Sequence, residues 1–264
     1  MEVCLATLET SDYILEHLQE EELQFGLVSY YYLKNNLIDT ILTKISKKLL
    51  IDSGAHSFQH GKKVDFDKYT EEYAEFIKKY TDNPKIEGFF EMDVDNVIGY
   101  EKVLELRKKL EAVSDKIIPV WHNNRGIDDF IDMCKKYSGK KIAITGFANN
   151  DIKDSQYNLF INTAHKYGCK IHILGLTRYE LIKSLNLGKD DSVDSSSWKQ
   201  TAIFGGINLP TRDNNIYRFS SLEGMKTNYK KYIYLNYLTA KEIQDRYADI
   251  DQSVIKKGID SNEE

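Results

Sequence analysis

The chain has 264 residues, of which 41% are hydrophobic and 29% charged, and a formal net charge of −5. This balance is that of an ordinary globular protein, long enough for one large domain, and it excludes a protein coated in basic surface for nucleic acid. No apolar run approaches the ~20 residues that cross a bilayer. The first residues also lack the basic and apolar segments of a signal peptide, so we expect a cytoplasmic protein that does not bind membranes.

Short β-branched runs alternate with longer amphipathic segments, which is typical of β–α repeats and a parallel sheet. In the segment of residues 67–80, aromatic side chains recur at three- and four-residue spacing, which indicates a helix lying on a sheet. A further strand near residues 201–204 has a less regular pattern. The expected strands are residues 3–8, 49–52, 88–92, 117–121, 142–145, 171–174 and 192–194, and the expected helices are residues 67–80, 100–113, 128–137 and 154–167.

Roughly eight β–α units predict the α/β class and a TIM-like (β/α)8 barrel in a single domain. An open doubly wound sheet is the competing architecture. No glycine-rich dinucleotide fingerprint follows the first expected strand, which disfavours a Rossmann domain. We expect the barrel to occupy residues 1–249 and a polar C-terminal tail to occupy residues 250–264.

Carboxylates stand at three of the expected strand ends, namely Asp52, Asp93 and Asp194. A single aspartate there is more often a helix N-cap, but the strand ends of a barrel meet on one face, and three carboxylates together indicate a polar substrate. Gly146 and Gly175 follow two further strands and would let a flat ligand approach the backbone. Two aspartates can cleave a glycosidic bond, one as nucleophile and one as acid and base. Their spacing does not separate sugar polymers from nucleosides.

The ordered motifs resemble those of the tRNA-guanine transglycosylases over residues 48–206. The sequence L-I-D-S-G-A at residues 50–55, with F-Q at 58–59, is similar to the family's D-S-G-G/A-F-Q motif, and E-M-D at residues 91–93 fits its third-strand aspartate. I-A-I-T-G-F-A at residues 142–148 resembles its purine platform. H-I-L-G at residues 172–175, followed by S-V-D at 192–194, resembles its nucleophile region.

The resemblance implies base exchange at a guanine nucleotide, with no cofactor. Asp194 would attack C1′ of the sugar and form a covalent glycosyl-enzyme, while Asp52 would protonate the leaving base and deprotonate the incoming one. Asp93 would bind the edge of the base. The remaining substrate contacts that the motifs imply are Ser53, Gln59, Gly146 and Gly175.

The zinc motif of the tRNA enzymes, C-x-C-x-x-C with a histidine, is absent from the sequence, and we expect no metal. The chain therefore resembles more closely the zinc-less phage and bacterial transglycosylases that insert 7-deazaguanines into DNA. The expected partners are DNA in preference to tRNA and a free 7-deazaguanine base, with accessory proteins that open the duplex as an open question. The alternatives are a tRNA-guanine transglycosylase, a nucleic-acid N-glycosidase and a non-catalytic nucleic-acid-binding barrel.

Histidines and a tryptophan raise two further hypotheses. Trp121 and His122 stand where the family has Q-G, and they predict a base-binding pair, with a buried core tryptophan as the alternative. A metal hydrolase built on His56, His60 and other histidines is disfavoured because the first strand lacks an H-x-H motif. We expect His172, placed near the start of its strand, to point to the opposite end of the barrel.

Basic and aromatic residues gather late in the chain, where residues 198–246 hold eight Lys and Arg against four Asp and Glu. Tyrosines and a phenylalanine are interleaved with them, a mixture that suits phosphate contact and base stacking. A solvated helix face above core tyrosines would produce the same pattern. The expected nucleic-acid contacts are Arg178, Lys199, Lys230 and Lys231.

Overall fold

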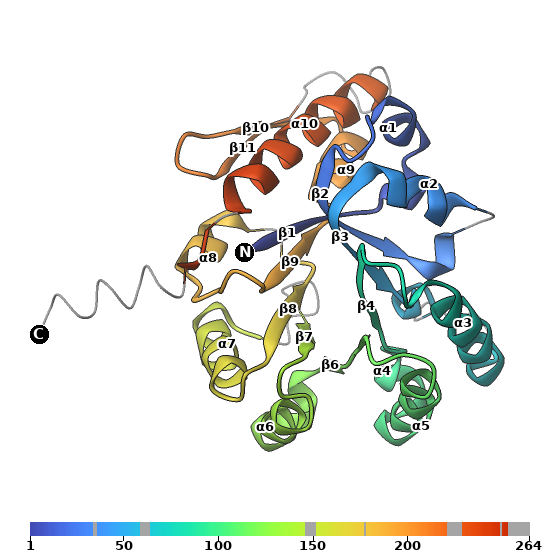
Figure 1. The fold of residues 1–264 in the computed structure, drawn as a ribbon. Helices are drawn as coiled ribbons and strands as arrows, with labels where there is room; N and C mark the ends of the chain where they lie inside the picture. The colour runs from blue at the N-terminus through green and yellow to red at the C-terminus, as the bar shows by residue number, and fades with distance from the viewer. Residues whose placement is uncertain are drawn as a thin grey trace, which may run out of the picture. The chain divides into compact units, whose positions relative to one another are not determined.

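The computed structural model describes residues 1–33, 36–58, 64–145, 152–176, 178–220, 229–248 and 250–252, except the side chains of residues 56, 58 and 220 (Figure 1). The chain has the TIM-like α/β fold class that the sequence predicts, because parallel strands alternate with helices along it. Its contacts cluster in two compact units. The N-terminal unit is Thr7–Val120, and the C-terminal unit is Met1–Ala6 with Trp121–Glu264. The division into a barrel and a tail stays a prediction, and residues 253–264 lie outside the described residues.

The N-terminal unit is built on parallel strands in the order β5-β4-β3-β2. In β3, Leu49, Leu50 and Ile51 are all fully buried, so this strand is covered on both faces, as strands of parallel sheets usually are. The strands are β2 (Leu23–Ser29), β3 (Ile45–Asp52), β4 (Ile86–Phe90) and β5 (Ile117–Ile118), and the α-helices are α1 (Asp12–His17), α2 (Leu37–Lys44), α3 (Phe66–Tyr80), α4 (Asp95–Ile98) and α5 (Tyr100–Glu111).

Helix α3 confirms the aromatic pattern expected at residues 67–80. The Asp65 side chain accepts a hydrogen bond from the Lys68 N–H (3.1 Å) and caps the first turn. On the buried face, the Tyr73 hydroxyl lies 3.2 Å from the carbonyl oxygen of Ile51 and 3.1 Å from that of Phe90. The helix is therefore tied to the ends of β3 and β4, next to the expected catalytic strand ends.

The C-terminal unit is built on parallel strands in the order β1-β9-β8-β7-β6. Helices α6 and α7 lie outside β7 and β8 (Figure 1). The strands are β1 (Glu2–Ala6), β6 (Val120–Trp121, at the boundary between the units), β7 (Lys141–Thr145), β8 (Lys170–Leu174) and β9 (Ser192–Ser195), and the α-helices are α6 (Gly126–Lys136), α7 (Tyr157–Lys166), α8 (Tyr179–Ser184), α9 (Ser197–Ile203) and α10 (Tyr229–Tyr247).

An antiparallel hairpin of β10 (Gly206–Pro210) and β11 (Ile216–Ser220) completes this unit. Asn236 of α10 attaches the hairpin, because its buried amide accepts from the Asn208 N–H (2.7 Å) and donates to the carbonyl of Gly206 (3.1 Å). The same amide donates to the carbonyl of Trp198 in α9 (3.0 Å). One buried side chain thus joins α9, α10 and the hairpin.

The structure differs from the sequence prediction in three features. The strand expected near residues 201–204 is the end of α9, because Trp198, Thr201 and Ala202 are buried at helical spacing. Strand β2 was not expected, and neither was the hairpin. The run of β2 is interrupted by Gly26, at which a Cβ would lie 3.0 Å from the Ile45 side chain, so close packing there favours glycine over a strand-forming residue. In the described part of the chain, no helix is long and apolar enough to span a bilayer.

Candidate active site

Asp194 stands near the C-terminal end of β9, where its side chain is 12% exposed. Its Oδ1 accepts a hydrogen bond from the Gly175 N–H (2.6 Å) and lies 3.3 Å from Nε2 of His172. Oδ2 receives no hydrogen bond from the described residues. The carboxylate is thus held by one oxygen, and the other is left for a substrate.

Gly175 directly follows β8 and has a φ of +66°, a backbone conformation that favours glycine. A Cβ at this position would meet no atom within 4 Å, so the backbone angle, and not lack of space, requires the glycine. The turn directs the Gly175 N–H at Asp194. That Gly175 supplies a backbone contact to the substrate stays a prediction.

A row of buried polar side chains leads from the N-terminal ends of the strands to Asp194. Lys141 Nζ lies 3.0 Å from a Glu2 carboxylate oxygen and 2.9 Å from Ser192 Oγ, and Ser192 Oγ lies 2.7 Å from Nδ1 of His172. All four of these side chains are less than 10% exposed. Ser192 therefore connects a buried ion pair to the imidazole that contacts Asp194.

One assignment of protons satisfies these contacts. The Lys141 ammonium donates to Glu2 and to Ser192 Oγ, and the Ser192 hydroxyl then donates to His172 Nδ1. With Nδ1 accepting, a neutral imidazole carries its proton on Nε2 and donates it to Asp194. The row then fixes both the tautomer and the orientation of the ring that holds the carboxylate.

The expectation that His172 points to the opposite end of the barrel is wrong. His172 is the middle residue of β8, and in the register of the parallel strands it pairs with Ser192, which in turn pairs with Glu2 of β1. Side chains two residues apart on a strand share a face, so Ser192 and Asp194 share one. His172 belongs to the same row and reaches Asp194. Knowledge of the register between β8 and β9 would have identified His172 as a neighbour of Asp194, but no local sequence pattern reveals that register.

Replacing His172 with phenylalanine is expected to slow any reaction step in which the Asp194 carboxylate takes part by about 10²-fold. The carboxylate then keeps only the Gly175 contact and loses its orientation. His172→Gln, whose amide can still donate to Asp194, should recover a large part of the rate. Single-turnover kinetics together with the unfolding free energy of both variants measure this. Equal rates for the two variants, or a loss that follows only stability, would contradict a positioning role for His172.

In the N-terminal unit, Asp52 is the last residue of β3 and is half-buried. Its Oδ2 accepts a hydrogen bond from the Gly54 N–H (2.9 Å). Gly54 has a φ of +81°, and a Cβ there would lie 2.3 Å from Cβ of Tyr31, so only glycine fits this turn. Ser53 is fully buried, and its carbonyl accepts a 2.7 Å hydrogen bond from the Tyr69 hydroxyl. The loop is built to present Asp52, whereas a substrate contact by the Ser53 side chain stays a prediction.

Asp93 follows β4 and is half-buried. Since β3 and β4 are adjacent parallel strands, Asp52 and Asp93 follow neighbouring strand ends in one unit. Glu91, two residues before Asp93, is fully buried. Its carboxylate accepts hydrogen bonds from Nε (2.5 Å) and Nη2 (2.8 Å) of Arg107 and from the Val120 N–H (2.6 Å). Burial raises the pKa of Glu91, and the Arg107 guanidinium and the Val120 N–H oppose that shift. Glu91 anchors the segment that carries Asp93.

The expectation that Trp121 stacks on a base is contradicted. Its indole is fully buried, with ring centroids 5.3 Å from Phe130 of α6 and 4.8 Å from Phe160 of α7. It is a core residue that attaches both helices to the sheet, which is the alternative that the sequence left open. His122 is also buried, and its role in base binding stays a prediction.

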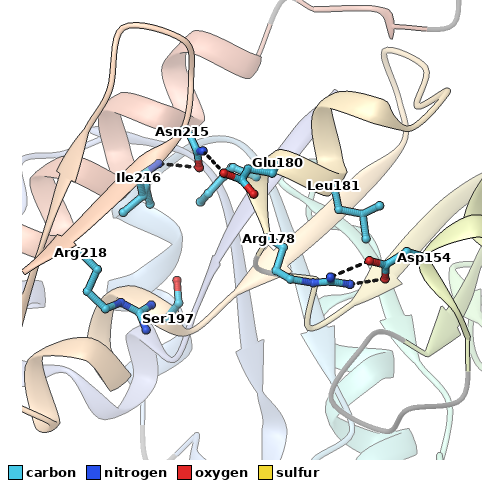
Figure 2. Close-up of a pocket in the computed structure, with 9 residues that line it drawn as sticks. Asp154, Arg178, Glu180, Leu181, Ser197, Asn215, Ile216 and Arg218 are labelled. Atoms are coloured by element: carbon cyan, nitrogen blue, oxygen red, sulfur yellow. Dashed lines mark hydrogen bonds and ion pairs between the residues drawn. The ribbon is translucent and has the colours of Figure 1, made fainter.

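The expected nucleic-acid contacts lie at three places in the C-terminal unit. Arg178 is half-buried before α8 and forms a two-pronged ion pair with Asp154 at the edge of a cavity of about 540 Å³ (Figure 2). Lys199 is half-buried on α9, and Lys230 and Lys231 are exposed on the first turn of α10. Gln59, Gly146, His60 and the side chain of His56 lie outside the described residues.

The comparisons with known proteins identify no family. No protein family matches the sequence, and no curated protein matches it. A fructose-1,6-biphosphate aldolase from Coccidioides immitis is similar in structure, with 11% identity and a TM-score of 0.48 over 96% of this chain and 89% of that one. A GH10 endoxylanase from a sugarcane soil metagenome has 9% identity and a TM-score of 0.41 over 94% and 82%. Likeness at this level does not indicate what this chain binds or converts.

Proposed function

We propose that this chain is a base-exchange glycosyltransferase that replaces guanine in DNA with a 7-deazaguanine. The observation that carries the proposal is the Asp194 carboxylate, held through Oδ1 by the Gly175 N–H and the His172 imidazole. A carboxylate fixed in this way suits nucleophilic attack on an anomeric carbon, because its second oxygen is oriented before the substrate arrives.

The reaction divides into two displacements. Asp194 attacks C1′ of the deoxyguanosine, the C1′–N9 bond breaks, and guanine leaves with a proton donated by the general acid. The incoming 7-deazaguanine then gives up its N9 proton, and its nitrogen attacks C1′ and releases the Asp194 carboxylate. The role of Asp52 as that acid and base rests on the resemblance of its motif and on its position at the end of β3.

Two observations favour this reaction over its alternatives. The three cysteines are buried free thiols, and the sequence has no zinc motif of the tRNA enzymes, which favours DNA as the polymer. The Asp194 side chain is largely covered and the His172 side chain completely so. A covered carboxylate limits the access of water to a glycosyl ester and favours exchange over hydrolysis.

An exchange assay tests the proposal. The protein is incubated with guanine-containing single-stranded DNA, duplex DNA or tRNA and a labelled 7-deazaguanine, and the polymers are digested and analysed by nucleoside mass spectrometry. We expect label in DNA, with one guanine released for each label incorporated. Release of guanine without incorporation would show an N-glycosidase instead. A folded protein that labels none of the three polymers would exclude base exchange.

A further inference from the structure

Two neighbouring cavities of the C-terminal unit share Ser197 and Arg218. The first, of about 540 Å³, is also lined by Arg178 and Asn215, and the second, of about 520 Å³, by Gln200, Phe204 and others. Ser197 lies three residues after Asp194, and three residues of extended chain span at most about 11 Å. Both cavities therefore begin beside the strand end that carries the proposed nucleophile.

Arg218 is the cationic side chain between these cavities. In Figure 2 its guanidinium extends from β11 toward Ser197, while Arg178 is engaged by Asp154. Among the described residues Arg218 contacts no carboxylate, and its Nε lies 3.4 Å from Oδ1 of Asn208. An exposed arginine without a carboxylate partner, beside a serine hydroxyl, is suited to a phosphate.

Aromatic rings project from the opposite face of the same strand. Tyr217 and Phe219 flank Arg218 in sequence, so they share the other face of β11, where they are 57% and 49% exposed. Their ring centroids are 4.6 Å apart. Leu209, the register partner of Tyr217 on β10, is exposed as well. Exposed apolar side chains gathered in this way mark a binding surface.

The charge of this part of the chain indicates which kind of molecule binds there. Residues 198–246 hold eight basic and four acidic residues, a local charge of +4 in a chain of net charge −5. Positive charge interleaved with exposed rings is complementary to a polyanion that carries flat bases. In a duplex the base faces are covered by neighbouring pairs, so stacking on side chains requires unpaired bases.

We infer that the β10–β11 hairpin and its two cavities bind single-stranded nucleic acid. Bases stack on Tyr217 and Phe219 on one face of β11. Where the strand passes around the edge of β11, a backbone phosphate lies between the Arg218 guanidinium and the Ser197 hydroxyl on the other face. The inference rests on the proposed function for the identity of this strand as the substrate. It adds the surface that holds the strand next to Asp194, and it specifies that the strand is unpaired there.

Binding of fluorescein-labelled dT12, measured by fluorescence anisotropy at several salt concentrations, tests the surface without the chemistry, because this strand has no guanine. The double variant Tyr217→Leu/Phe219→Leu keeps apolar bulk and removes the rings, and we expect at least about tenfold weaker binding. The matched swap Tyr217→Phe/Phe219→Tyr keeps both rings and should bind like the unaltered protein. Arg218→Gln should weaken binding and reduce the salt slope by about 0.7.

Lys135→Gln is the charge control, because Lys135 is exposed on α6 and pairs with Asp132. The salt dependence of dT12 binding by this variant should equal that of the unaltered protein. No dT12 binding by the unaltered protein, or unchanged binding by the leucine variant, would overturn the inference. The inference would also be overturned if the unaltered protein were a dimer that Tyr217→Ser/Phe219→Ser converts to a monomer with no change in dT12 binding. If dT12 binds as expected but the exchange assay fails, the surface stands and the proposed function does not.

Discussion

Asp194→Asn is expected to abolish the covalent protein–DNA adduct and to slow exchange at least about 10³-fold. The amide has the shape of the carboxylate, and its oxygen can still accept from the Gly175 N–H and from His172, so the strand end should keep its structure. An amide is a very poor nucleophile, so no glycosyl ester forms. Denaturing gels of protein trapped during turnover detect the adduct, and single-turnover kinetics measure the rate.

The matched control is Asp190→Asn, which removes an exposed carboxylate four residues away that pairs only loosely with Lys170 (3.6 Å). This variant should form the adduct at the unaltered rate. An adduct that persists in Asp194→Asn would refute the assignment and move the nucleophile to Asp52, where Asp52→Asn should then remove it. Normal unfolding curves for these variants are required before either result is interpreted.

Breaking the buried Glu91–Arg107 pair is expected to destabilise the protein by about 3–5 kcal/mol at pH 7. Both side chains are almost completely buried, so removing either one leaves an uncompensated charge. In Arg107→Met the remaining carboxyl can escape this cost by taking up a proton. In Glu91→Gln the guanidinium cannot lose its proton, so its cost stays. Urea unfolding followed by circular dichroism measures both variants. The control is Lys135→Gln, which breaks an exposed ion pair and should unfold like the unaltered protein.

The two variants should differ in their dependence on pH. Burial already raises the pKa of Glu91, and removal of Arg107 takes away a group that opposes the shift. An acid with a raised folded-state pKa contributes stability that is present below its unfolded pKa, about 4.3, and is lost as the pH rises through the folded value. The deficit of Arg107→Met relative to the unaltered protein should therefore be smallest near pH 4 and grow toward pH 7. That of Glu91→Gln, which lacks the titrating carboxyl, should not grow over this range. If the unfolding free energies of the two variants changed with pH in the same way, the result would contradict a buried charged pair.

Local sequence was sufficient where one segment carries its own signal. The apolar run Leu49–Ile51 predicts β3 because both faces of that strand are buried, and the aromatic spacing of α3 predicts its buried stripe. Strand β2 was missed because Gly26 interrupts its run. The β-branched residues at the end of α9 were read as a strand because burial of Trp198 against Tyr237 of α10, which makes the segment helical, comes from a distant part of the chain.

The residues of the candidate site also divide into those that local sequence predicted and those that it did not. The sequence by itself determined that Asp52 and Asp194 stand at or near strand ends and that Asp52 precedes a glycine turn, because alternation of apolar runs and turn residues is a local property. Only the tertiary structure decided that Trp121 is sealed in the core and that His172 faces Asp194, since burial and strand register depend on how distant segments pack. The exposed rings of the hairpin were decided there as well, because the packing of α10 determines which residues of β10 and β11 are covered.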